Sequence, residues 1–143
     1  MPVTGKAAAF ALRPADIKRM ARAHPDLKKV VMEAARITTI PFTILQADRT
    51  IEQQRQNVAK GVSWTMDSRH LIDAKGLVYA VDIAPLVDGK VTWSWPVYHK
   101  LAPIMKKAAA NVGVPVGWGG DWKKTPDGPH WELDRKRYPA AKK

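Results

Sequence analysis

The chain has 143 residues, of which 45% are hydrophobic, and it contains six Trp and no Cys. This length and composition predict one packed domain, and they exclude a disordered chain, disulfides and cysteine-ligated zinc. The 24 Lys and Arg residues outnumber the 13 Asp and Glu residues and give a net charge of +11, which favours polyanionic partners. No recognisable nucleic-acid-binding motif accompanies the charge, so nucleic acid and anionic cell envelope both stay open on charge alone.

The first half of the chain predicts three helices and a strand. The first helix is expected from Pro14 to Arg22, with Pro14 in its first turn. A second helix follows from His24 to about Ile37, because apolar residues recur there at helical spacing. The β-branched and apolar segment 41–46 is typical of a strand. Thr50 can cap a third helix from 51 to about 60.

The second half predicts strands around a further helix. Residues 61–75 look like an irregular loop, and 79–85 like a strand whose Tyr79, Val81 and Ile83 face the core while Asp82 faces the other way between two alanines. Asp-Gly supplies a hairpin turn within 87–91. A helix is expected from Pro96 to about 111, with Pro103 either kinking it or moving its start. A short strand at 130–133 precedes a basic tail, 134–143.

Two histidines and an aspartate, which are His70, Asp82 and His130, can hold zinc and leave a fourth position for water. Asp127 precedes His130 by three residues, and a bend at Gly128-Pro129 would bring their side chains together. Asp127 could then act on that water as a general base. Arg49, at a predicted strand end, could donate to a substrate carbonyl or carboxylate.

Each of these residues also has an ordinary structural explanation. A single His in a loop is usually a surface residue, His130 could pack against Trp131, and Asp127 could belong to an Asp-Gly turn. Arg49 could form a surface salt bridge. The spacing does not contain a His-Glu-x-x-His helix, so the zinc hypothesis depends on these segments converging in the fold.

These segments resemble the zinc D-Ala-D-Ala peptidase family, and especially its phage L-alanyl-D-glutamate endopeptidase branch. The family pattern of Ser-x-His, Ala-x-Asp and Asp/Glu-x-x-His is matched in order by 68–70, 80–82 and 127–130. Segments 24–27, 48–50 and 118–122 are also similar, so the likeness covers roughly residues 20 to 133, the expected catalytic core of a single peptidase domain over 1–143.

The resemblance implies an α+β domain with an antiparallel sheet and packed helices, of the type shared with Hedgehog domains. It implies Zn²⁺ as cofactor and the peptide stem of peptidoglycan as substrate. The implied roles are zinc ligation by His70, Asp82 and His130, general-base catalysis by Asp127, and substrate positioning by Arg49. Substrate contacts are further expected from three residues in the matched segments: Ser68, Trp118 and Asp121.

The chain departs from the family pattern between the first His and the Asp. Members usually separate them by seven residues with a Gly four before the Asp, whereas His70 and Asp82 are twelve apart and position 78 is Val. A five-residue insertion near 73–77 accounts for the difference, and a longer loop is energetically tolerable. Asp73 is therefore a competing ligand, although the local sequence and the rigid strand favour Asp82.

The main hypothesis is therefore an endolysin that cleaves between L-Ala and D-Glu. The N-terminal segment is too short and too poorly flanked for a signal peptide or a membrane span, so we expect a monomer in the host cytoplasm that reaches the wall after another phage protein permeabilises the membrane. Its basic charge would favour adsorption to the anionic envelope, and no nucleic-acid partner is expected. The alternatives are a D-Ala-D-Ala carboxypeptidase or dipeptidase, and a non-catalytic basic module that binds cell wall or nucleic acid.

Overall fold

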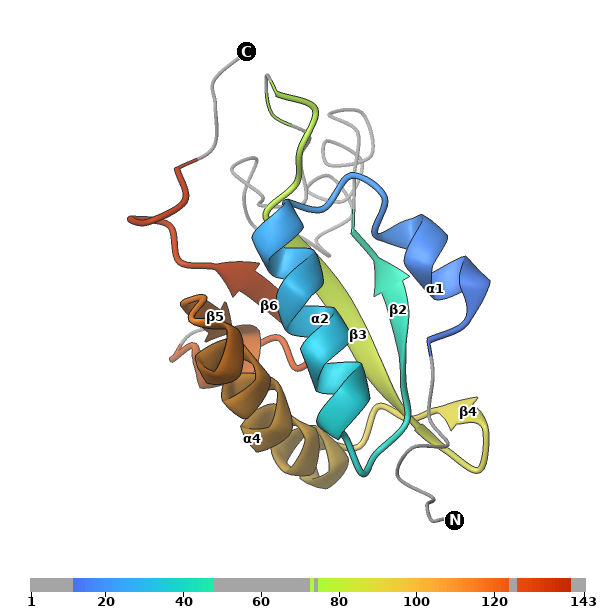
Figure 1. The fold of residues 1–143 in the computed structure, drawn as a ribbon. Helices are drawn as coiled ribbons and strands as arrows, with labels where there is room; N and C mark the ends of the chain where they lie inside the picture. The colour runs from blue at the N-terminus through green and yellow to red at the C-terminus, as the bar shows by residue number, and fades with distance from the viewer. Residues whose placement is uncertain (1–11, 48–72, 74, 124–125, 140–143) are drawn as a thin grey trace, which may run out of the picture.

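The computed structural model describes residues 12–47, 73, 75–123 and 126–139. Within these ranges the structure is an α+β fold in which helices α2 and α4 lie side by side against one face of an antiparallel sheet, while α1 lies beside the edge strand β2 (Figure 1). The helices are α1 (Pro14–Arg19), α2 (Pro25–Ile37) and α4 (Trp95–Val112), and the strands are β2 (Phe42–Gln46), β3 (Ala80–Val87), β4 (Lys90–Val91), β5 (Val116–Trp118) and β6 (His130–Leu133). None of the helices in these ranges is long and apolar enough to cross a bilayer.

Helix α2 forms where its apolar periodicity predicts it. The Nδ1 atom of His24 accepts a hydrogen bond from the backbone N–H of Asp26 at 3.0 Å and so caps the helix start. The buried side of α2 faces the core with the residues that recur at helical spacing. These are Leu27, Val30, Val31, Ala34 and Ala35. Burial of this apolar face, rather than intrinsic propensity, stabilises the helix.

Helix α1 is shorter than predicted, because it ends at Arg19 instead of Arg22. The residues that follow leave the helix to meet the chain just before β3. The N–H of Val78 donates to the carbonyl of Arg22, and the N–H of His24 donates to the carbonyl of Val78, both at 2.9 Å. These long-range bonds replace the helical bonds that the local sequence predicted.

The sheet has the order β2-β3-β6-β5, with β4 paired to the end of β3, and all these pairs are antiparallel. The central strand β3 continues two residues beyond the predicted end, to Val87, where the Asp-Gly hairpin turn returns the chain into β4. Val81 and Ile83 are fully buried in the core. The alternation of β3 therefore places Asp82 on the opposite face, away from the helices.

Helix α4 begins at Trp95 and continues through Pro103, so the proline does not move the helix start. Pro103 lies on the exposed side of the helix, where water can solvate the carbonyl that the missing N–H leaves without a partner. The helix ends at Gly113, whose φ of 70° is the left-handed conformation of a helix C-cap. Strand β5, which follows, was not predicted.

Candidate metal centre

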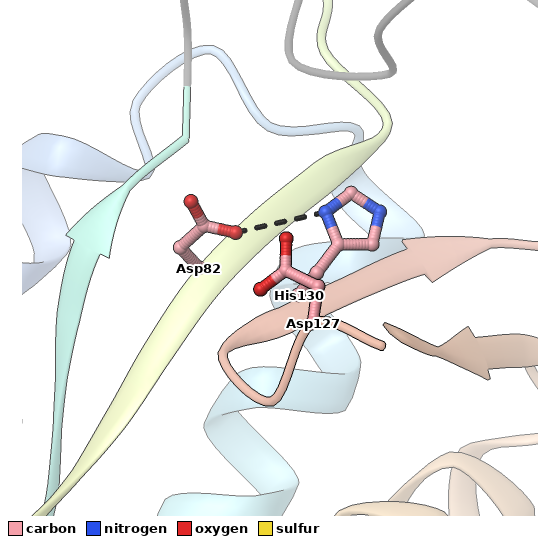
Figure 2. Close-up of side chains that lie close together, drawn as sticks. All are labelled: Asp82, Asp127 and His130. Atoms are coloured by element: carbon pink, nitrogen blue, oxygen red, sulfur yellow. Dashed lines mark ion pairs between the residues drawn. The ribbon is translucent and has the colours of Figure 1, made fainter. Parts of the chain in front are cut away.

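The register between β3 and β6 places Asp82 directly opposite His130. Side chains of opposed residues in an antiparallel pair leave the sheet on the same face. The Oδ1 atom of Asp82 accordingly lies 3.6 Å from the Nδ1 atom of His130, and the two side chains point toward one another in Figure 2. The two residues that flank Asp82 on this face, Ala80 and Ala84, are small, so they leave the carboxylate accessible. The sheet itself thus brings together two residues that are 48 positions apart in the sequence.

Asp127 reaches the same place from the turn that precedes β6. The N–H of His130 donates to the carbonyl of Asp127 at 3.3 Å, which closes a turn over Gly128-Pro129. In a straight strand, residues three positions apart such as Asp127 and His130 would have side chains on opposite faces. The turn brings the two side chains to the same side. One ligand atom from each of Asp82, Asp127 and His130 lies within 4.8 Å of the other two.

Several contacts hold the 127–130 turn in place. The indole N–H of Trp118 donates to the carbonyl of Gly128 at 2.7 Å, and its ring stacks on Trp131 with 5.7 Å between centroids. The backbone N–H of Ile83 donates to the carbonyl of Pro129 at 2.8 Å. Trp118 is only 4% exposed, so in this structure its contacts lie with the turn and the core.

The backbone of Gly119 lies directly against this turn. Its carbonyl accepts a hydrogen bond from the N–H of Asp127 at 3.0 Å. A Cβ atom on Gly119 would lie 2.3 Å from the carbonyl oxygen of Asp127 and 3.0 Å from the Cβ of His130. Only glycine therefore fits here without displacing two residues of the site.

Carboxylates surround the imidazole of His130 on both sides. Its Nε2 atom lies 2.7 Å from Oε1 of Glu132, opposite the contact between Nδ1 and Asp82. Burial by itself would lower the pKa of His130, but interactions with the carboxylates of Asp82 and Glu132 outweigh burial and raise the pKa to about 9 without a bound metal. Burial would likewise raise the pKa of Glu132, yet His130 and Arg135 lower it to about 2.

Tyr98 from α4 lies against this cluster on the far side of the turn. A Cβ atom on Gly128 would lie 3.0 Å from the Tyr98 ring. Burial, together with the charges of Asp127 and Asp82, raises the pKa of Tyr98 to about 12. Its buried hydroxyl has no hydrogen-bond partner among the described residues. The hydroxyl thus stays protonated at neutral pH and can donate to a ligand or water that enters the site.

Asp82 and His130 fit a zinc ion in chemistry and in spacing. Imidazole nitrogen and carboxylate oxygen are zinc ligands, and two ligands of a tetrahedral zinc at about 2.0–2.1 Å lie roughly 3.4 Å apart. The 3.6 Å between His130 and Asp82 is close to that separation. Because Glu132 occupies Nε2, the nitrogen of His130 that faces the cluster is Nδ1.

The remaining residues predicted for the site are either outside the described part of the chain or on its surface. His70, Arg49 and Ser68 fall outside the described residues, as does the helix expected over 51–60. Asp121 lies on the surface, where its carboxylate pairs with the ammonium of Lys106 at 2.8 Å.

The competing ligand Asp73 lies in a turn before β3 and does not join the cluster of Asp82, Asp127 and His130. Its carboxylate accepts hydrogen bonds from the backbone N–H groups of Lys75 and Leu77 and from the hydroxyl of Tyr79. Glu132 was not predicted, although its position two residues after His130 in a strand places both side chains on one face.

A buried histidine and two carboxylates on an antiparallel sheet form a group that could hold a metal ion, as in metal-dependent hydrolases. Residues 8–142 match the family model of the phage L-alanyl-D-glutamate peptidase. The chain belongs to this family.

Individual relatives agree with the family match. The L-alanyl-D-glutamate peptidase of Escherichia phage T5 is 31% identical over 125 residues, which cover 85% of this chain and 87% of that protein. The L-alanyl-D-glutamate peptidase of Listeria phage A118 is 30% identical over 87% of this chain but only 41% of its own length. The crystal structure of the Serratia marcescens L-Ala D-Glu endopeptidase ChiX superposes with a TM-score of 0.81 and 34% identity, covering 94% of this chain and 98% of that one.

These findings confirm the resemblance inferred from the sequence and the α+β fold with its antiparallel sheet and packed helices. They also confirm the prediction of an enzyme over that of a non-catalytic binding module, because the matched relatives are peptidases.

Proposed function

We propose that this chain is a zinc-dependent endolysin that hydrolyses the bond between L-Ala and D-Glu in the peptide stem of peptidoglycan. The observation that carries the proposal is the convergence of Asp82, Asp127 and His130 in a member of the phage L-alanyl-D-glutamate peptidase family. Asp82 and His130 are the proposed ligands in this cluster, and Asp127 is the further carboxylate. The family membership is what suggests the class of substrate.

In this mechanism Asp82 and His130 would hold zinc together with His70 and leave room for a water molecule. Bound there, zinc would acidify that water and polarise the scissile carbonyl. Asp127, which lies at the end of a braced turn beside both ligands, accepts the proton of the attacking water and returns it to the leaving amine. Arg49 donates to a carbonyl or carboxylate of the substrate.

Three further residues complete the proposed substrate site. Ser68 contacts the stem peptide, and Asp121 interacts with it from the surface segment that follows β5. Trp118, whose indole N–H donates to Gly128, contributes to substrate binding through the shape of the turn that carries Asp127.

The biological setting belongs to the same proposal. The monomeric enzyme waits in the host cytoplasm until another phage protein opens the membrane. The net charge of +11 then favours its adsorption to the anionic envelope, and this attraction weakens as salt rises. Peptidoglycan is its partner, and nucleic acid is not.

Digestion of purified peptidoglycan tests the cleaved bond. With zinc present, we expect mass spectrometry to show stems cut between L-Ala and D-Glu, which leaves L-Ala on the sugar and frees peptides that begin with D-Glu. Release of free D-Ala would instead identify a D-Ala-D-Ala carboxypeptidase or dipeptidase. Intact stems after incubation would refute peptidase activity on this substrate.

Two variants test the assigned roles. Asp127→Ala should keep stoichiometric zinc and lose lysis, because it removes the base and leaves the ligands. His70→Ala should lose both. Normal lysis by Asp127→Ala would show that another group takes the proton.

A further inference from the structure

We propose that Glu132, itself held by Arg135, is a positioning residue that fixes the ring and the tautomer of His130 so that Nδ1 is the nitrogen presented to the metal. This inference rests on the zinc site proposed above, and it assigns a function to two residues outside the ligand set. Neither residue contacts the reacting atoms, so both would act through His130.

Strand geometry places Glu132 beside the ligand. His130 and Glu132 are two residues apart in β6, so their side chains leave the sheet on the same face. The residue opposite Glu132 on β3 is Ala80, and the residue opposite it on β5 is Gly117. Neither neighbour crowds the Glu132 carboxylate, because Ala80 carries only a methyl group and even a Cβ on Gly117 would meet nothing within 4 Å.

The imidazole lies between two carboxylates, one at each nitrogen. Oε1 of Glu132 lies 2.7 Å from Nε2, whereas Oδ1 of Asp82 lies 3.6 Å from Nδ1. The shorter contact is a hydrogen bond, and the longer one has the separation of two ligands on one metal. An ionised carboxylate can only accept, so Nε2 must keep its proton, and Nδ1 is the nitrogen that would give up its proton to bind the metal.

Arg135 fixes the orientation of Glu132. Its Nε donates to Oε2 at 2.8 Å, and its Nη2 lies 3.5 Å from Oε1, the oxygen that contacts His130. The guanidinium thus holds both oxygens of Glu132, more closely at Oε2, while Oε1 also contacts the imidazole. The Glu132 side chain is 10% exposed and that of Arg135 is 49% exposed, so the pair reaches from the buried ligand to the surface.

A second glutamate–arginine pair in this chain has the same spacing but no proposed metal ligand beside it, so it serves as a comparison. Glu33 and Arg36 have the same three-residue spacing, with contacts of 2.8 and 2.7 Å on the surface of α2. The Arg36 side chain is 69% exposed and that of Glu33 14%, and Glu33 also accepts a hydrogen bond from Asn111 instead of contacting a histidine. The pair at Glu132 differs because one carboxylate oxygen contacts His130, and partners of ligating histidines usually affect metal affinity and activity about 10–100-fold.

Zinc affinity of the full chain tests the proposal without relying on activity. We would measure the zinc dissociation constant by competition with a chromophoric chelator for the wild type, Glu132→Gln and Arg135→Gln. Matched controls are Glu33→Gln and Arg36→Gln. Glu132→Gln should weaken zinc binding about 10–100-fold and Arg135→Gln by a smaller factor, while both controls stay within about twofold. The visible spectrum of the Co²⁺-loaded protein should change in the first two variants only, because it reports ligand geometry.

Thermal unfolding of each metal-free variant separates positioning from general destabilisation. Wild-type affinity and an unchanged Co²⁺ spectrum in a folded Glu132→Gln protein would overturn the inference and leave the proposed zinc peptidase intact. If Glu132→Gln fails to fold, Arg135→Gln decides by the same criteria, because its half-exposed side chain can be shortened without opening the core. A wild type that binds no stoichiometric zinc would instead overturn the proposed function together with this inference.

Discussion

Adding one methyl group at Gly119 should disable the site, although Gly119 carries no reactive group. In Gly119→Ala the new Cβ would lie 2.3 Å from the carbonyl oxygen of Asp127, where ordinary contact begins at 3.4 Å. The turn must therefore retreat by about 1 Å. The obstructing atoms belong to backbone and to the Cβ of His130, so no flexible side chain can move aside to relieve the overlap.

The size of the effect follows from that displacement. A shift of about 1 Å in a catalytic group can reduce activity about 100-fold, and here the proposed general base and a proposed ligand move together. Overpacking of this kind costs about 1–3 kcal/mol of folding free energy. For a domain of this size that corresponds to a fall in Tm of roughly 4 °C per kcal/mol.

The assay is the rate of release of peptides from purified peptidoglycan, with zinc affinity and Tm measured on the same preparations. Gly117→Ala is the matched control, because a Cβ at Gly117 meets nothing within 4 Å. It should stay within about twofold of the wild type. Wild-type rate and zinc affinity in Gly119→Ala would refute the conclusion that this close approach positions Asp127 and His130.

Three further predictions concern protons and the contacts that support the fold. The pKa of His130 is about 9 without metal, so zinc binding at pH 7 should release about one proton and should weaken as pH falls. Calorimetry in buffers of different ionisation enthalpy measures this release, and a binding heat that is the same in every buffer would contradict it. Burial would raise the pKa of Asp16, but hydrogen bonds from Thr43, Ile44 and Arg13 lower it below its usual 3.8; its stabilisation is therefore present above about pH 4 and lost as pH falls through the lowered pKa. Asp16→Asn should flatten the acid side of a plot of unfolding free energy against pH, and an unchanged slope would contradict this. Trp118→Phe leaves the Gly128 carbonyl without its donor and should cost about 1–3 kcal/mol in denaturant unfolding; an unchanged midpoint would contradict that role.

The elements that the sequence predicted well are those with a long local pattern. Helix α2 shows 3.6-residue periodicity over thirteen residues, and β3 alternates around a buried apolar face. The end of α1 was predicted three residues too far along the chain, because the backbone pairing of Arg22 and His24 with Val78 is a long-range contact. Strand β5 was missed because three residues with a central glycine carry almost no pattern.

The site was predictable to a similar degree. A strand position exposes Asp82 on one face, and a Gly-Pro bend allows Asp127 to meet His130, so both could be inferred locally. The register that pairs Asp82 with His130 depends on how β3 and β6 align, and only the likeness to a known family suggested it. The contact of Glu132 with Arg135 depends on the turn after β6, which no local pattern specified.

The segment just before β3, where the sequence predicted an insertion, contains a turn that is bonded within itself. Besides the bonds to its carboxylate, Asp73 donates from its N–H to the carbonyl of Leu77 at 2.9 Å and accepts at its own carbonyl from the N–H of Gly76 at 3.0 Å. Gly76 has a φ of 79°, which other residues rarely adopt.

Downstream of this turn, pairing with β2 and β6 sets the position of Asp82, independently of the loop length. The carboxylate of Asp73 cannot serve both this turn and a metal, since moving it to the cluster would leave the N–H groups of Lys75 and Leu77 without their acceptor. The bonds of Asp73 therefore favour Asp82 as the proposed ligand, because the Asp73 carboxylate already closes this turn.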